Sequence, residues 1–249
     1  MMKAVLTLLV LLGTTGGAPG APPRTAVLIE LFTSEGCSSC PPADALLARL
    51  LADQPLDGVQ IIPLEFHVDY WDRLGWKDPF SAVVFTRRQQ DYSKVFGEDR
   101  VYTPQVVVDG AAEVLGSDEP RVTDAIRKAA TAMHLPLGVS ASLKGDALRL
   151  TVEAPAASGG LEKTDIVVAL VEDGLSSAVR RGENGGRTLR HAAVVRRHQV
   201  IGALEPETFV GEGEWRVNTA WQRPQLRVVA FLQGQKTRRI YGAASAAVQ

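Results

Sequence analysis

Apolar runs and amphipathic stretches alternate in the first third of the chain. Residues 26–33 are apolar almost throughout, which predicts a strand buried on both faces. Residues 43–51 place alanine and leucines at i, i+3, i+4, i+7 and i+8, the pattern of a helix with one apolar stripe. A second apolar run covers residues 59–66. Strand, helix and strand at this spacing predict a βαβ unit with parallel strands.

The pattern continues with shorter elements up to residue 134. Asp78-Pro79 is a helix-start signal, and the predicted helix runs to about Phe96. Residues 105–110 and 113–116 predict a hairpin around an Asp-Gly turn. A further helix follows Ser117-Asp118. We therefore expect an α/β domain over residues 26–134, with the helix after Asp78 as an insertion.

The period changes after Pro136. Residues 139–152 alternate on both sides of Lys-Gly-Asp, which predicts another hairpin. Further strand candidates cover residues 166–171, 193–201, 215–221 and 226–232. Short strands separated by turn signals predict an all-β, sandwich-like domain over residues 138–243. The join at residues 135–138 is short and partly apolar, so we expect the two domains to pack together.

The first residues predict a secretory signal peptide at residues 1–18. Lys3 supplies a positive charge, residues 4–12 are apolar except for Thr7, and small residues follow. The apolar run is far shorter than the roughly 20 residues of a membrane-spanning helix. We expect a secreted or periplasmic protein with no membrane attachment after cleavage.

Composition and charge describe an ordinary globular protein. The 249 residues are 45% hydrophobic and 22% charged, and the formal net charge is −1. Nothing in this balance favours a nucleic-acid partner. The only two cysteines are Cys37 and Cys40, between the first predicted strand and the first predicted helix. Thiols this close can form a redox pair, a local disulfide or half of a metal site.

Several motifs carry a resemblance to known proteins. Val27 to Cys40 resembles the active-site strand and loop of thioredoxins, and Val101 to Gly110 resembles their cis-proline loop. The whole chain is similar to a secreted bacterial family, domain-of-unknown-function family 1223, in residues 31–44, 66–72 and 102–106. The resemblance implies an α/β thioredoxin-like N-terminal domain followed by an all-β (sandwich-like) C-terminal domain.

The thioredoxin resemblance also implies roles for five residues. Cys37 is the expected nucleophile and Cys40 the resolving thiol. Glu30 falls where thioredoxins keep a buried acid, so it is a candidate to accept the proton of Cys40. The alternative is that Glu30 is a salt-bridged strand residue. Thr103-Pro104 would offer a backbone edge to an extended substrate.

Two prolines depart from the thioredoxin pattern. Pro41 and Pro42 follow Cys40 directly, and a residue before proline avoids helical geometry. We therefore expect the helix to begin at Pro42 or later, with less dipole stabilisation of the Cys37 thiolate. A structural disulfide loop remains an alternative.

A second candidate site follows the second predicted strand. Parallel strands of a βαβ unit end at the same sheet edge, so His67 should lie beside the cysteine loop. His67, Asp69, Trp71 and Asp72 could line a binding cleft there. The alternative is that the aromatic side chains pack the inserted helix while the acids cap it.

Three functions follow from these residues. The first is thiol–disulfide oxidoreductase activity on an unknown protein or small thiol substrate. The second is a non-catalytic binding module that keeps a structural disulfide. The third is the handling of a soft metal ion by two thiolates and His67. We assign no metal site and expect no cofactor.

Overall fold

The structure is a computed structural model that describes residues 24–156 and 161–249. Residues 1–18, the expected signal peptide, lie outside the described residues. The helices are α1 (Pro41–Asp53), α2 (Val83–Phe96) and α3 (Glu119–Ala130), with 3-10 turns η1 (Asp72–Leu74) and η2 (Arg223–Gln225). The strands are β1 (Thr25–Thr33), β2 (Val59–His67), β3 (Gln105–Val108), β4 (Ala112–Leu115), β5 (Gly138–Lys144), β6 (Ala147–Ala154), β7 (Thr164–Glu172), β8 (Leu175–Ala178), β9 (Thr188–His191), β10 (Val194–Ala203), β11 (Phe209–Arg216), β12 (Leu226–Gly234) and β13 (Ile240–Ala247).

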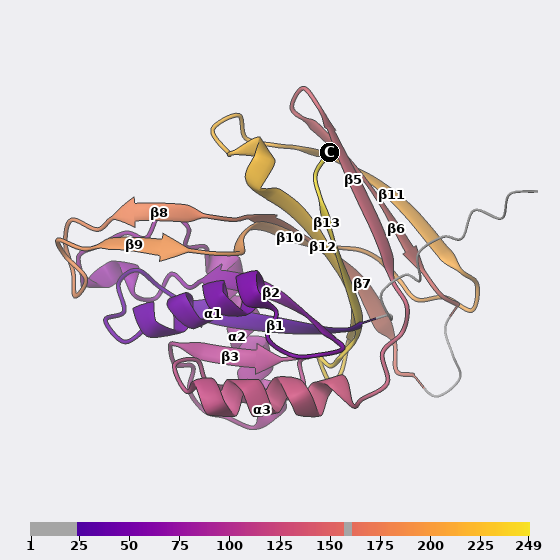
Figure 1. The fold of residues 1–249 in the computed structure, drawn as a ribbon, viewed down its shortest axis with the longest axis horizontal. Coiled ribbons are helices and arrows are strands. Elements are labelled where there is room, and N and C mark those ends of the chain that lie inside the picture. The colour runs from indigo at the N-terminus through magenta and orange to yellow at the C-terminus, as the bar shows by residue number, and fades with distance from the viewer. Residues whose placement is uncertain (1–23, 157–160) are drawn as a thin grey trace, which may run out of the picture.

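One large mixed sheet runs through both halves of the chain. Its strand order is β13-β12-β7-β10-β2-β1-β3-β4. The strands β11, β6 and β5 form a separate three-stranded sheet, which lies at the upper right of Figure 1. The hairpin β8-β9 extends to the opposite side, over the region of α1. The three helices gather around β1, β2 and β3 (Figure 1).

The expected fold class, an α/β thioredoxin-like N-terminal domain followed by an all-β C-terminal domain, is wrong. Strands from the second half join the first-half strands in one sheet, and the described chain is mostly β with three short helices. The joining pair is β10 beside β2, parallel, with Val194 opposite Glu65. Such a long-range pairing leaves no local pattern in the sequence, which is why the two halves looked like separate domains.

The central strands of this sheet are apolar on both faces because each face covers a core. Val167, Ala169 and Val171 of β7 belong to the core beneath the helices. Val168 and Leu170, which point the other way, belong to the core shared with β5, β6 and β11. The sheet is therefore the middle layer of the molecule.

The junction between the two halves is packed. Leu135 and Leu137, from the segment between α3 and β5, pack against the core shared with β5, β6 and β11. The Leu135 N–H also donates to the Tyr241 carbonyl at 2.6 Å. Both contacts tie this segment to the second half of the chain.

Two helix starts differ from the expectation. Helix α1 begins at Pro41, and Cys40 has helical dihedral angles (φ −78°, ψ −38°) as its N-cap. Two backbone N–H groups, of Ala43 and Asp44, donate to the Cys40 carbonyl and outweigh the preference of a pre-proline residue. Helix α2 begins at Val83 and not near Asp78, which is buried and used elsewhere.

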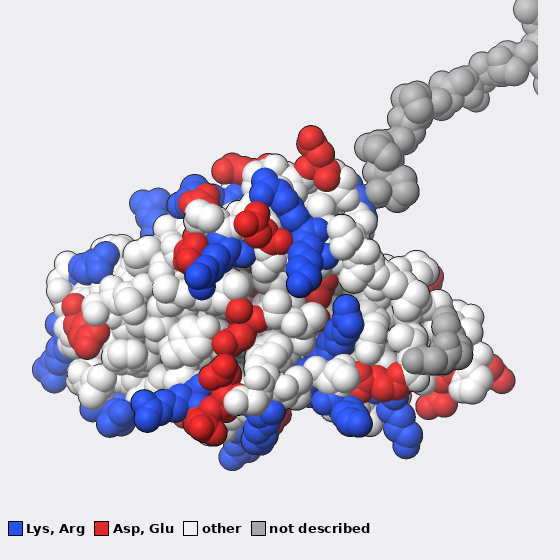
Figure 2. All heavy atoms as spheres, turned by 90° about the horizontal axis from the view of Figure 1, so that it is seen from below, with Lys and Arg blue, Asp and Glu red and all other residues white. Residues whose placement is uncertain are grey.

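The surface carries charges of both signs. Lysine and arginine side chains lie interspersed with aspartate and glutamate on the face shown in Figure 2. Within residues 24–156 and 161–249, no helix has the length and apolar character needed to cross a membrane.

Candidate functional site

Cys37 and Cys40 form a disulfide in the loop between the C-terminal end of β1 and the start of α1. Both cysteines are fully buried, whereas Ser38 and Ser39 between them are exposed. Sγ of Cys37 lies 4.0 Å from the carbonyl oxygen of Thr103. The peptide bond between Thr103 and Pro104 is cis. The loop and the cis proline, far apart in sequence, are therefore neighbours.

A segment from the second half of the chain covers the disulfide loop. Nδ2 of the buried Asn184 donates to the carbonyl oxygens of Glu35 and Cys37, each at 2.9 Å. The carboxylate of Glu183 accepts from the Ser38 N–H at 3.0 Å. These bonds tie the loop to the segment between β8 and β9.

Glu30 lies on the other face of the sheet from this site. Its carboxylate binds Arg88 of α2 at 2.5 and 2.8 Å and accepts from the Tyr92 hydroxyl. Gln233 of β12 contacts both Arg88 and Tyr92. Thr33 points to α1 instead, and side chains alternate along a strand, so Glu30 faces away from α1. In this structure Glu30 is a salt-bridged strand residue.

The predicted binding residues after β2 lie in the loop that leads to α2. Asp69 accepts from the Thr86 hydroxyl, and Asp72 accepts from the Ser81 hydroxyl and from a backbone N–H. Nε1 of Trp71 donates to the Thr103 hydroxyl at 2.8 Å, which ties this loop to the cis-proline segment. The two carboxylates thus hold the loop in shape, while Trp71 contacts the disulfide region.

His67 belongs to a buried cluster that joins both halves of the chain. Its Nε2 lies 3.1 Å from Oε1 of Glu65, and Nδ1 of His191 lies 2.7 Å from the same oxygen. The three side chains are fully buried. The backbone N–H of Ala192 donates to the other oxygen of Glu65. Glu65 thus connects β2 to the end of β9.

Two more carboxylates bind the outer nitrogens of the two histidines. Nδ1 of His67 lies 2.7 Å from Oδ2 of Asp78, and Nε2 of His191 lies 3.2 Å from Oε1 of Glu35. Trp76 donates to Glu35, whose own N–H donates to Asp78. Every ring nitrogen of the two histidines therefore faces a carboxylate oxygen.

These contacts shift the pKa of several groups. Burial alone would lower the pKa of His67, but the Asp78 carboxylate and the hydrogen bonds to Asp78 and Glu65 raise it to about 9. Burial would also lower the pKa of His191, but the charge of Glu65 and the hydrogen bonds to Glu35 and Glu65 raise it to about 11. Both imidazoles are therefore doubly protonated near neutral pH.

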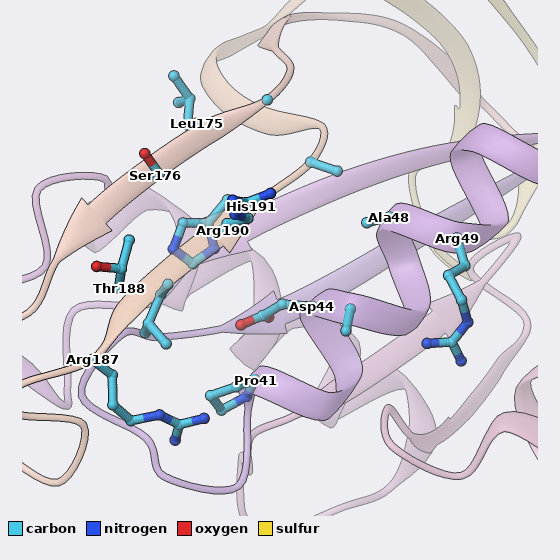
Figure 3. A pocket seen from close by; sticks show the side chains of 14 residues that line it. Pro41, Asp44, Ala48, Arg49, Leu175, Ser176, Arg187, Thr188, Arg190 and His191 are labelled. Carbon is cyan, nitrogen blue, oxygen red and sulfur yellow. The ribbon is translucent and has the colours of Figure 1, made fainter.

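Asp44 of α1 lies close to this cluster and lines a cavity. It accepts from the Thr33 hydroxyl at 2.7 Å, and burial, followed by the charge of Glu65, raises its pKa to about 7. A cavity of about 710 Å³ lies between α1 and the β8-β9 hairpin, with Asp44 and His191 in its lining. Figure 3 shows these two side chains on facing walls, with Arg49 and Arg187 toward opposite ends.

Sequence reasoning missed most of this cluster. Asp44 lies in the predicted helix over residues 43–51 and Glu65 in the apolar run over residues 59–66, and neither pattern marks them as site residues. His191 lay in a basic, glycine-containing stretch with no recognisable motif. The one available signal was Glu65 itself, a charge inside an otherwise apolar run, since a fully buried charge needs partners.

The fold and the site define a mostly β protein with a large mixed sheet, a disulfide loop and a buried histidine–carboxylate cluster at one sheet edge. The chain belongs to the family described as Protein of unknown function (DUF1223), whose model matches residues 28–233.

Solved structures resemble this chain to different degrees. A crystal structure of a protein from Agrobacterium tumefaciens shares 27% identity and a TM-score of 0.69, over 90% of this chain and 95% of that chain. A domain of the outer membrane lipoprotein Omp28 from Porphyromonas gingivalis shares 15% identity and a TM-score of 0.31, over 47% of this chain and 89% of that chain. No curated protein matches the chain.

Proposed function

We propose that this protein carries out thiol–disulfide exchange through Cys37 and Cys40. The observation that carries the proposal is the position of the cysteine pair between the N-terminus of α1 and the cis-proline segment. Cys40 is the N-cap of α1, and Sγ of Cys37 lies 4.0 Å from the Thr103 carbonyl that precedes the cis proline. The N-terminal end of a helix stabilises a nearby thiolate and lowers its pKa.

Exchange would proceed in two steps. The Cys37 thiolate attacks one sulfur of a substrate disulfide, whose second sulfur leaves as a thiolate and takes up a proton. Cys40 then attacks Cys37, which re-forms the protein disulfide and releases the first substrate sulfur as a thiol. Two electrons pass from the protein to the substrate. Of the two protons that the products take up, one comes from Cys40 and one from solvent, because Cys37 reacts as a thiolate. The reverse sequence oxidises a substrate dithiol, as suits the secretory location expected from residues 1–18.

The loop must open before either step. Both cysteines are fully buried, and Asn184 and Glu183 hold the loop from the second half of the chain. Loss of the three hydrogen bonds between these two side chains and the loop would allow the loop to open beside Thr103. The substrate is then a protein segment or small thiol able to enter that opening.

The same burial favours a second candidate function. In a binding protein with a structural disulfide, the bond would only stabilise the loop beside the 710 Å³ cavity. Structural disulfides of secreted proteins resist reduction, with potentials below about −300 mV. The two functions therefore predict different reduction potentials for the Cys37–Cys40 disulfide.

Trapping and redox titration distinguish them. The Cys40→Ser variant retains Cys37 and should accumulate mixed disulfides with substrates, whereas Cys37→Ser should not. The wild-type disulfide should equilibrate with glutathione at a potential above about −300 mV. A potential below that value, with no mixed disulfide on Cys40→Ser, would exclude exchange and leave a structural role for the disulfide.

A further inference from the structure

We propose that Glu65, His67 and His191 form a binding site for a divalent transition-metal ion such as Zn²⁺. Oε1 of Glu65 contacts Nε2 of His67 and Nδ1 of His191. One ligand atom from each of the three residues lies within 4.8 Å of the other two. Two imidazole nitrogens and one carboxylate oxygen are the donor set that such ions prefer. This inference is independent of the exchange chemistry proposed for the cysteines.

The spacing of the three atoms suits a common ion. Oε1 of Glu65 lies 3.1 Å from His67 Nε2 and 2.7 Å from His191 Nδ1. An ion bonded to each at about 2.0–2.2 Å needs donor atoms roughly 3–3.5 Å apart, which small rotations of the side chains supply. The two imidazole rings stand at 77° to each other with centroids 4.7 Å apart, and one nitrogen of each contacts the same Glu65 oxygen.

The outer contacts are those that orient metal ligands. A ligating histidine usually donates its second ring N–H to a carboxylate, which fixes the tautomer and the ring orientation. His67 has Asp78 in that position, at 2.7 Å, and His191 has Glu35, at 3.2 Å. The N–H of Ala192 holds the outer oxygen of Glu65, so the inner oxygen faces the two imidazoles.

The charge of the cluster also suits a cation. Three buried carboxylates, those of Glu35, Glu65 and Asp78, surround two imidazoles. Oε1 of Glu65 lies within hydrogen-bond distance of one nitrogen of each imidazole. A divalent ion bound at this point would hold each imidazole in its neutral form, with the other ring nitrogen donating to its outer carboxylate.

An entry path and a further coordination position lie on the cavity side. His191 and Asp44 line the cavity of about 710 Å³ between α1 and β9 (Figure 3). An ion held by three protein atoms keeps a fourth position open, as in catalytic zinc sites. That position would face Asp44 or a small molecule in the cavity.

Binding to the oxidised protein tests the site. The mature chain, with the Cys37–Cys40 disulfide intact so that thiolates cannot bind, is stripped with a chelator and titrated with ZnCl₂ and CoCl₂. We expect one equivalent of ion per chain, and visible Co²⁺ absorption bands typical of a four- or five-coordinate site with nitrogen ligands. Absence of stoichiometric binding by this wild-type protein would overturn the proposal.

Variants locate the ion. Glu65→Gln and His191→Ala should weaken Zn²⁺ binding by more than the about 10–100-fold expected for Asp78→Asn, which removes only an outer contact. The matched control is His134→Ala, because His134 also pairs with an aspartate, Asp109, but lies outside the cluster. Circular dichroism checks the folding of each variant. Unchanged binding by a folded Glu65→Gln or Asp78→Asn protein would place the ion elsewhere and contradict the proposal.

Discussion

Oε1 of Glu65 lies 2.7 Å from Nδ1 of His191, although the two residues are 126 positions apart in the chain. The main chains meet at the same place, because the Glu65 N–H donates to the Ala193 carbonyl at 2.8 Å. One glutamate thus connects the first-half strand β2 to the second-half segment by main chain and side chain. The buried cluster therefore lies where β10 of the second half pairs with β2 of the first half.

The first prediction concerns the segment over the disulfide. Asn184→Ala removes the hydrogen bonds to the carbonyls of Glu35 and Cys37 and the one accepted from Arg187, and should lower the free energy of unfolding by about 1–3 kcal/mol. Reduction of the disulfide by dithiothreitol should become faster, because the loop opens more often. Urea denaturation and thiol release measure the two effects.

Asn218→Ala is the control for this change. Asn218 is exposed and accepts one local bond from the Ala220 N–H. Its loss should change the free energy of unfolding by no more than about 0.5 kcal/mol. Equal reduction rates for Asn184→Ala and wild type would show that Asn184 does not restrict access to the disulfide.

The second prediction concerns the buried ion pair on the other face of the sheet. Arg88→Met leaves the Glu30 carboxylate buried without its partner and should cost about 3–5 kcal/mol in unfolding free energy. Arg49→Met is the matched control, because Arg49 pairs with Glu119 at the surface and is 52% exposed. It should cost less than about 1 kcal/mol. Similar losses in the two variants would argue against this assignment.

The third prediction concerns acid stability and His198. Burial, and then the charge of Arg88, lower the pKa of His198 to about 4. The unfolded chain has a histidine pKa near 6.5, so it binds a proton that the native state excludes between these values. His198 should therefore remove about 1–3 kcal/mol of stability as the pH falls from about 6.5 to 4. The His198→Gln variant should lack this contribution in urea denaturation across that range.

His134→Gln gives the opposite dependence and serves as the comparison. The hydrogen bond to Asp109 raises the pKa of His134 above its usual value. Its stabilising contribution is complete below about pH 6.5 and is lost as the pH rises through the folded-state pKa. A wild-type advantage over His198→Gln that grows as the pH falls would contradict the His198 assignment.

The fourth prediction concerns the contact between the β3-β4 turn and the β12-β13 turn. Gly110 has φ +61°, and a Cβ placed there would collide with the Arg238 carbonyl. Gly145 has a similar φ of +65°, but a Cβ there meets nothing within 4 Å. Gly145→Ala should cost about 1–2 kcal/mol from backbone strain alone. Gly110→Ala should cost clearly more in thermal denaturation, and equal losses would contradict the close contact.

Some elements follow from the sequence because their causes are local. The apolar run of β1, the helical stripe of α1 and the Lys-Gly-Asp turn between β5 and β6 depend on neighbours a few positions away. The disulfide between Cys37 and Cys40 likewise joins the only two cysteines across a single turn. Such features are determined by the chain itself.

Only the tertiary structure decided the sheet and the cluster. The pairing of β10 with β2 and the meeting of Glu65 with His191 bring together residues more than a hundred positions apart. Nothing in the sequence near His191 encodes its partner, because the contacts that offset the cost of burying these carboxylates and imidazoles form only when the two halves of the chain meet. Asp78 shows the same limit: its place before a proline predicts a helix cap, but burial beside His67 gives it a different role.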